Sequence, residues 1–281
     1  MIDHNGQAKY PTEPVTRVVA IANEKGGVAK TTTSVNLATC LALADRRTLL
    51  VDLDNQGNAT SSVGVDRIAD RIGAPEVLLG EAEAAQAVVS TEIPGLDLIP
   101  ASRELAGIDI DLFGSMERPQ FALREAGLER LGYDYVIIDT PPSLGLVPIN
   151  ALAAATACLV PQQTEYLALE GLGSMLNTFE KVRGALNPGL TIDGVVLTMF
   201  DTRTRLHHQV ADDVRTHLGA LVFKEVIPVN VRLAEAPSFG KPVLLYDIDS
   251  RGAQAYLRFT AEYLERVEGG STPVEHLEVH P

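Results

Sequence analysis

The chain has 281 residues, of which 46% are hydrophobic and 21% charged, a balance typical of a soluble globular core. No run approaches the roughly 18 consecutive apolar residues that cross a bilayer, and the polar first residues are unlike a secretory signal, so we expect a cytoplasmic protein. The formal net charge of −14 argues against a uniformly basic nucleic-acid-binding protein.

Apolar, β-branched runs alternate with helical patterns along the chain. This alternation predicts a single α/β domain with a mostly parallel twisted sheet and helices on both faces. The expected strands are residues 18–22, 49–53, 96–99, 135–138, 157–160, 194–198 and 226–228. The expected helices, judged from apolar residues at three- and four-residue intervals, are residues 30–44, 75–79, 103–110, 120–131, 146–155, 168–186, 206–218 and 250–267.

The two ends of the chain differ from its middle. Residues 1–15 and 269–281 are polar and contain proline or glycine, so we expect a flexible N-terminal arm and a flexible C-terminal tail around one domain at residues 16–268. Acidic residues clearly outnumber basic ones in residues 61–134 but not in residues 201–260. The later segment therefore fits either a local basic face or a mixed solvated surface.

The first strand is followed by Asn23-Glu24-Lys25-Gly26-Gly27-Val28-Ala29-Lys30-Thr31-Thr32, which opens the first predicted helix. Adjacent glycines let backbone N–H groups close around a phosphate, and the helix N-terminus adds unpaired donors and a positive dipole end. Lys30 is placed to reach the β- and γ-phosphates, and Thr31 to ligand Mg²⁺. The strict pattern G-x-x-x-x-G-K-[ST] fails only at Glu24 and Ala29.

A second lysine, Lys25, lies five residues ahead of Lys30 and is the mark of a deviant Walker A loop. The stretch resembles the ParA/MinD/Soj family of P-loop ATPases, and the resemblance extends over about residues 17 to 265. It implies that Lys25 and Lys30 act in catalysis, with Lys25 reaching the nucleotide of a partner subunit. The implied ATP-binding residues are Lys25, Gly26, Gly27, Val28, Ala29, Lys30, Thr31 and Thr32.

Ala29 departs from the family, which usually has glycine before the lysine of the loop. If the backbone there has a positive φ, an alanine costs about 1 kcal/mol of strain, whereas in ordinary helical geometry it costs nothing. The sequence leaves both conformations open.

Acidic residues follow two of the predicted strands. The segment Val51-Asp52-Leu53-Asp54-Asn55-Gln56-Gly57-Asn58 is similar to the family pattern D-x-D-P-Q-G-N, which implies that Asp54 positions or activates the attacking water and lies near the metal. Asn55 replaces the usual proline and so loses its fixed φ. Asp139, in Ile138-Asp139-Thr140-Pro141-Pro142-Ser143, matches the Walker B acid. The implied Mg²⁺ site consists of Thr31, Asp54 and Asp139.

The C-terminal third resembles the family at two further places. In the segment 226–237, Pro228 and Asn230 match residues that border the adenine ring. Arg203 and Arg232 match positions that contact DNA in Soj-type proteins, although either arginine alone would fit a surface ion pair. The segment 165–171 also matches the family, and we expect it near the dimer face unless its apolar members simply pack in the core.

Histidine and cysteine supply no metal site in this sequence. His207 and His208 are adjacent, so on a helix they point in different directions, and we expect them to be solvated. Cys40 and Cys158 lack metal-ligand spacing and fit buried apolar positions in a reducing compartment.

The resemblance implies an ATPase that segregates chromosomal or plasmid DNA. Two subunits would close on two Mg·ATP, with Lys25 of each crossing to the other nucleotide, and the closed homodimer would bind double-stranded DNA without sequence readout. A ParB-type centromere-binding protein would stimulate the slow hydrolysis and so release the DNA. We therefore expect a cytoplasmic, nucleoid-associated protein with no membrane partner.

Three alternative functions can be weighed against this one, and the residues count against the first two. A MinD-like division-site ATPase binds membrane through a basic amphipathic C-terminal helix, but Glu268 to Pro281 include three Glu, two Pro and no Lys or Arg. An electron-transfer protein like the nitrogenase iron protein would need paired cysteines at an interface, which Cys40 and Cys158 do not fit. A nucleotide-dependent DNA-binding regulator with weak hydrolysis is the third, and Ala29 keeps this alternative open.

Overall fold

The computed structural model describes residues 16–66, 71–143 and 145–269, so the predicted arm at 1–15 and the tail from 270 lie outside the described residues. The described chain forms one α/β fold around an eight-stranded sheet with the order β3-β4-β2-β5-β1-β6-β7-β8. All neighbouring strands are parallel except β3 and β4. The strands are β1 Arg17–Ile21, β2 Thr48–Asp52, β3 Val89–Ser90, β4 Leu96–Ile99, β5 Tyr135–Asp139, β6 Ala157–Gln163, β7 Thr191–Phe200 and β8 Val222–Pro228.

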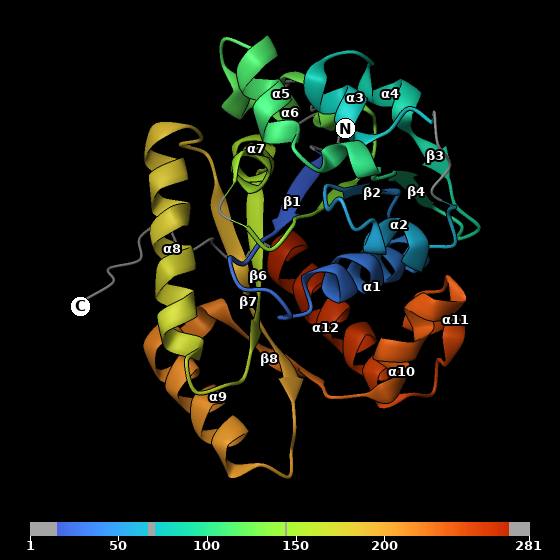
Figure 1. The fold of residues 1–281 in the computed structure, drawn as a ribbon. Coiled ribbons are helices and arrows are strands. Elements are labelled where there is room, and N and C mark those ends of the chain that lie inside the picture. The colour runs from blue at the N-terminus through green and yellow to red at the C-terminus, as the bar shows by residue number, and fades with distance from the viewer. Residues whose placement is uncertain (1–15, 67–70, 144, 270–281) are drawn as a thin grey trace, which may run out of the picture.

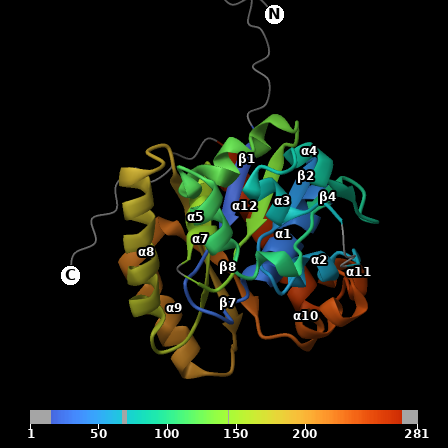
Figure 2. The ribbon, with the colours of Figure 1, turned by 45° about the horizontal axis from the view of Figure 1, so that its top comes forward.

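Helices cover both faces of this sheet (Figure 1). In that view α8 lies to one side of the strands and α1 and α12 lie to the other, and the turned view of Figure 2 keeps this arrangement. The helices are α1 Lys30–Leu43, α2 Asn58–Ser62, α3 Ala74–Leu79, α4 Ala84–Ala87, α5 Ile108–Ser115, α6 Ala122–Glu125, α7 Leu146–Ala154, α8 Ala168–Ala185, α9 Arg205–Leu218, α10 Val231–Glu235, α11 Val243–Tyr246 and α12 Arg251–Glu268.

The two faces form two separate hydrophobic cores, because side chains alternate along each strand. On β1, Val18 and Ala20 join the core beneath α3 and α5–α9, whereas Val19 and Ile21 join the core beneath α1, α11 and α12. Nearly every strand residue is buried, as expected for a parallel sheet covered on both sides. The predicted fold class is confirmed.

Two predicted helices are shorter than expected because glycines interrupt them. The predicted helix 103–110 is a 3₁₀ turn at 103–105 followed by α5, and Gly107 between them has φ 90°. The predicted helix 120–131 is likewise reduced to α6 with a 3₁₀ turn on each side, and Gly127 after α6 has φ 67°. In the left-handed region a glycine ends a helix at little steric cost.

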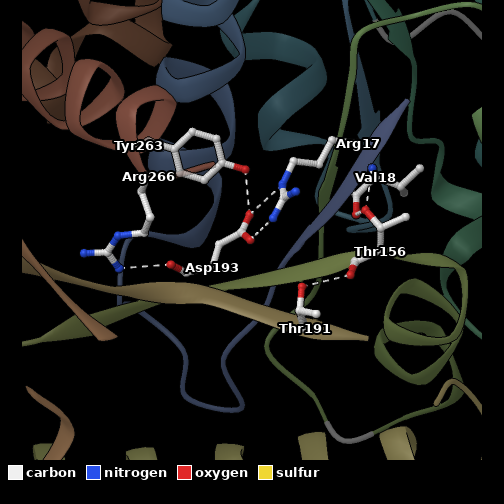
Figure 3. A network of polar contacts seen from close by, with 7 residues as sticks. All are labelled: Arg17, Val18, Thr156, Thr191, Asp193, Tyr263 and Arg266. Carbon is white, nitrogen blue, oxygen red and sulfur yellow. Dashed lines mark hydrogen bonds and ion pairs between the residues drawn. The ribbon is translucent and has the colours of Figure 1, made fainter. Parts of the chain in front are cut away.

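A largely buried polar network joins the first residues of β1 and β7 to α12 (Figure 3). Asp193 on β7 forms an ion pair with Arg17 of β1 and accepts a hydrogen bond of 2.7 Å from the Tyr263 hydroxyl. Its backbone carbonyl accepts from Arg266 at 3.0 Å. A Cβ at Gly194 would lie 2.4 Å from the Arg266 guanidinium and 2.6 Å from the Leu221 carbonyl, so only glycine leaves room for this arginine.

Candidate nucleotide-binding site

The predicted phosphate-binding loop lies between the end of β1 and the start of α1, at the carboxyl edge of the sheet. The Asn23 side chain anchors it, since its nitrogen donates to the Pro161 carbonyl at 2.8 Å and its Oδ1 accepts from the Lys25 backbone N–H at 3.0 Å. Thr198, buried on β7, donates to the Val28 carbonyl at 3.1 Å. Strands β6 and β7 therefore hold the loop in shape.

Two residues of the loop have left-handed backbone. Gly27 has φ 77°, and Ala29, directly before α1, has φ 67° and ψ 34°. Ala29 thus adopts the conformation that favours glycine, at a cost of about 1 kcal/mol for its Cβ. The Thr33 N–H bonds the Ala29 carbonyl at 2.9 Å, so α1 begins here. The N–H groups ahead of Thr33 have no partner within the helix and suit an anion.

Lys30 is buried at the foot of the loop, and its ammonium donates to the Lys25 carbonyl at 2.9 Å. Burial lowers the pKa of Lys30, while the charges of Asp139 and Asp54 act in the opposite direction. The amine therefore lies between the loop and two acids, where it can pair with a phosphate.

Asp52 and Asp139 end β2 and β5 and are register partners, so two buried carboxyl groups lie side by side. Asp52 Oδ2 accepts from the N–H and the hydroxyl of Thr60, both at 2.7 Å. Asp139 Oδ1 accepts from the Ser34 hydroxyl at 2.8 Å, but among the described residues its Oδ2 has no hydrogen-bond partner. Burial and then the charge of Asp52 raise the pKa of Asp139. An orphaned carboxylate oxygen beside a phosphate loop fits a hard cation such as Mg²⁺.

Asp54 differs from Asp52 in its contacts. Both Asp52 oxygens are bound within the chain, because its Oδ1 accepts from the Asp54 N–H at 3.1 Å. Asp54 is 7% exposed, and its Oδ1 accepts from the Gln56 N–H in the turn that leads to α2. Asp52 therefore serves to hold the local structure together. Asp54 lies close enough to Lys30 for its charge to raise the pKa of the lysine.

A cavity of about 220 Å³ opens beside the first turn of α1. Its lining includes Thr31 and Thr32 from α1, and Leu233 and Pro237 from the segment after β8. The predicted adenine neighbours Pro228 and Asn230 are not among its lining residues. Instead, Asn230 caps α10, with its Oδ1 accepting from the Arg232 N–H at 3.0 Å.

The second lysine of the loop lies at the surface. The Lys25 ammonium pairs with Glu165, and the two side chains are 41% and 30% exposed. Glu24 is tied to α8 by hydrogen bonds of 2.6 Å from the hydroxyls of Ser174 and Thr178. Tyr166, next to Glu165, is 83% exposed, and aromatic residues are enriched at protein interfaces.

Of the two predicted DNA-binding arginines, Arg203 lies in the loop after β7 and Arg232 in the first turn of α10, shortly after β8. These strand ends are neighbours, since Phe200 pairs with Pro228 in the sheet. The Arg203 guanidinium makes two hydrogen bonds of 2.9 Å to Asp201, and its side chain is 86% exposed. Arg232 pairs with Glu235 and Asp247. Both arginines are accessible, and both carry carboxylate partners.

The expectation that His207 is solvated is wrong. Its Nδ1 lies 2.9 Å from the Thr164 hydroxyl and accepts from the Asp201 N–H at 3.0 Å, so it braces the loop that carries Arg203. His208 is exposed, as expected. Within residues 16–66, 71–143 and 145–269, no group of three or more His, Cys, Asp or Glu could hold a metal ion.

Comparisons with known proteins show which family this chain belongs to. A family model described as an AAA domain matches residues 16–192, more than half of the chain. The chromosome partitioning protein ParA of Caulobacter vibrioides is 53% identical over 254 residues, which cover 89% of this chain and 94% of that protein. The sporulation initiation inhibitor protein Soj of Bacillus subtilis is 48% identical over 246 residues, which cover 88% of this chain and 97% of that protein. The chain belongs to the ParA/Soj family of P-loop ATPases.

The solved structures include a similar fold with a bound nucleotide. Cobyrinic acid a,c-diamide synthase from Mycobacterium smegmatis, with an ATP analog and magnesium, has a TM-score of 0.79 and 38% identity. The alignment covers 92% of this chain and 98% of that chain. In the part of this ParA/Soj family member that the structure describes, no helix has the length and apolar character needed to cross a membrane.

Several residues of the site were missed at the level of sequence. Ser34 supports Asp139 from one helical turn after Lys30, and this spacing was available as a signal in the first predicted helix. The contact between Glu165 and Lys25 gave no comparable signal, because the two residues are distant in sequence. Thr60 gave none because it lies on the short helix α2, which no periodicity reveals.

Proposed function

We propose that this ParA/Soj family member is an ATP-dependent DNA-partitioning protein. The observation that carries the proposal is the pairing of a preformed phosphate loop with the orphaned oxygen of Asp139, in a chain 53% identical to a chromosome partitioning protein. Lys30 and the first turn of α1 would bind the phosphates of ATP. Thr31 and Asp139 would hold Mg²⁺, with Asp54 beside it, and the ion would neutralise charge on the phosphates.

Within this proposal, Asp54 orients the attacking water. Its carboxylate is buried near Lys30 and is not consumed by a strand-end network as that of Asp52 is. The cavity beside Thr31 and Thr32 would receive the ribose and base, so we add Leu233 and Pro237 to the predicted neighbours Pro228 and Asn230.

The nucleotide would also join two copies of the chain. Lys25 is half-exposed and is held by Glu165 of its own chain, so its amine is free to exchange this partner for the phosphates of an ATP bound by the other subunit. A lysine delivered there would add positive charge where the transferred phosphoryl group develops negative charge. The exposed Tyr166 beside Glu165 would lie on the same face.

DNA binding would follow from this pairing. A single chain has a net charge of −14 and presents Arg203 and Arg232 already paired with carboxylates, so its own attraction for phosphates is weak. Two chains would double the number of arginines on one surface. Contacts of this kind read no sequence, and four of them predict a slope of about −3 to −4 in a plot of log affinity against log salt.

A ParB-type centromere-binding protein would be the partner that accelerates hydrolysis and so ends DNA binding. The support is that the relative from Caulobacter vibrioides is a chromosome partitioning protein. DNA binding by the ATP-bound pair would make the protein nucleoid-associated until this partner triggers hydrolysis.

The test is DNA binding by fluorescence anisotropy, measured without nucleotide, with ADP, with ATP, and with ATP on Asp54→Ala, across a salt series. We expect binding only with ATP, prolonged binding by Asp54→Ala, and loss of binding in Arg203→Glu and Arg232→Glu. Arg118→Glu is the matched control, because Arg118 is also exposed and paired with one carboxylate but lies beside α6.

Equal DNA binding in all nucleotide states would rule out the switch. Nucleotide-dependent binding to liposomes with none to DNA would favour a MinD-like function instead. DNA binding with ATP but no hydrolysis, with or without a partner, would favour the nucleotide-dependent regulator.

A further inference from the structure

The two adjacent histidines near the start of α9 both contact the loop that follows β7. His207 Nδ1 accepts a hydrogen bond of 3.0 Å from the backbone N–H of Asp201. His208 Nε2 lies 2.9 Å from the Thr202 carbonyl, which can only accept, so this nitrogen donates. The backbone of the two residues directly ahead of Arg203 is therefore bonded to side chains of α9.

His207 is also joined to the sheet, on the side away from the loop. Its Nδ1 lies 2.9 Å from the hydroxyl of Thr164, the residue directly after β6. Thr164 is fully buried, and its N–H donates to the Thr198 carbonyl of β7 at 3.3 Å. One imidazole nitrogen therefore connects the Asp201 backbone to a buried point of the sheet.

The position of Arg203 depends on Asp201. The Arg203 backbone N–H donates to Asp201 Oδ1 at 3.0 Å, and the guanidinium makes one hydrogen bond of 2.9 Å to each oxygen of the same carboxylate. The Arg203 side chain is 86% exposed, so packing does little to restrain it. The loop backbone that His207 holds is therefore the main restraint on where this arginine lies.

A restrained loop favours the binding of a phosphate. An exposed ion pair is weak, so the Arg203 guanidinium can exchange Asp201 for a phosphate oxygen. If the loop backbone also had to be ordered at that moment, the lost conformational freedom would reduce the affinity. The contacts of His207 provide this order in advance.

We propose that His207 is a positioning residue for DNA binding by Arg203. The inference rests on the proposed DNA binding of the ATP-bound pair. His207 is half-buried and its Nδ1 is occupied by Asp201 and Thr164, so it acts through the loop and makes no phosphate contact of its own.

The test is a double-mutant cycle between His207→Ala and Arg203→Ala, with the affinity for a fluorescent DNA duplex measured at saturating Mg·ATP across a salt series. His207→Ala is expected to lower the affinity about three- to tenfold. The slope of log affinity against log salt should stay that of the wild type, because the arginine is still present, whereas Arg203→Ala should reduce the slope by about one for each arginine lost. In the Arg203→Ala background, His207→Ala should cause no further loss.

Two further variants separate positioning from folding. His207→Asn places an acceptor oxygen near the position of Nδ1, so it should restore most of the affinity. His217→Ala should match the wild type, because His217 lies on the same helix but its Nδ1 contacts the Asp213 carbonyl and not the loop. Hydrogen exchange at the Asp201 amide should be faster in His207→Ala and slow again in His207→Asn, while the affinity for Mg·ATP stays unchanged.

The outcomes distinguish this inference from the function on which it rests. No DNA binding by the wild-type chain at any nucleotide state would overturn the proposed function, and the inference with it. DNA binding by the wild type that His207→Ala leaves unchanged, despite faster exchange at Asp201, would overturn the inference alone. An equal loss of affinity in the presence and absence of Arg203 would overturn it as well, because His207 would then not act through this arginine.

Discussion

Ala29 is one of three described residues other than glycine that have a positive φ, together with Asp45 and Met199. It holds φ 67° directly before α1, where a Cβ is unfavourable. We predict that Ala29→Gly raises the free energy of unfolding by about 1 kcal/mol and changes nucleotide affinity by about tenfold or less. Urea unfolding and equilibrium binding of a fluorescent ATP analogue check the two parts.

Ala261→Gly is the matched control for Ala29→Gly. Ala261 is exposed within α12, where the backbone is helical, so the same change should lower stability by about 1 kcal/mol. The same change from alanine to glycine would then raise the free energy of unfolding at position 29 and lower it at position 261. A loss of stability in both variants would show that the left-handed conformation of Ala29 carries no strain.

We predict that, without bound metal or nucleotide, the stability of the protein depends on pH because of Asp139. Its pKa in the folded chain is raised above the ordinary value of about 4 by burial and by the charge of Asp52, so the folded state binds the proton more tightly than the unfolded state. The stability that protonation contributes is complete below the unfolded pKa and is lost as the pH rises through the folded pKa.

The difference in stability between wild type and Asp139→Asn isolates this effect, because the amide does not titrate. In EDTA, wild type should lose stability relative to Asp139→Asn as the pH is raised from about 4 towards neutrality. Urea midpoints at several pH values measure it. A difference that stays constant, or that grows in favour of wild type, would contradict the raised pKa.

At the level of elements, the network around Asp193 attaches α12 to the sheet. Its carboxylate is 2% exposed and pairs with Arg17, which is 28% exposed, and with the Tyr263 hydroxyl. We predict that Asp193→Ala lowers the free energy of unfolding by about 2–3 kcal/mol, less than for a fully buried pair because Arg17 keeps contact with water. Tyr263→Phe should cost about 1 kcal/mol.

Arg203→Ala provides the contrast to Asp193→Ala. It also breaks an ion pair with an aspartate, but one on the surface, so we expect no measurable change in the urea midpoint. A similar loss of stability in both variants would mean that burial does not distinguish the two pairs.

Elements with a continuous apolar run could be predicted from sequence, and elements held by tertiary contacts could not. The strand predicted at 135–138 is found within β5, where every residue is buried. Strand β7 begins before the predicted strand 194–198. Asp193 interrupts the apolar run in the sequence, but its contacts with residues of β1 and α12 allow it to be buried within the strand. The two-residue strand β3 is too short to produce a periodic signal.

The same difference between local sequence patterns and tertiary contacts holds for the whole molecule. The phosphate loop and the acids Asp54 and Asp139 are local patterns at strand ends, so the sequence was sufficient to place them at one edge of the sheet. The pairing of Lys25 with Glu165 and the contact of His207 with Thr164 depend on how distant segments pack. No spacing along the chain predicts such contacts.

The claim on which the whole account depends is that Mg·ATP joins two copies of this chain. The most direct measurement is light scattering of Asp54→Ala, in which hydrolysis is blocked, with and without Mg·ATP. The account predicts the mass of two chains with Mg·ATP, the mass of one chain without it, and one chain in both cases when Lys25→Ala is added. The mass of a single chain for Asp54→Ala at saturating Mg·ATP would contradict it.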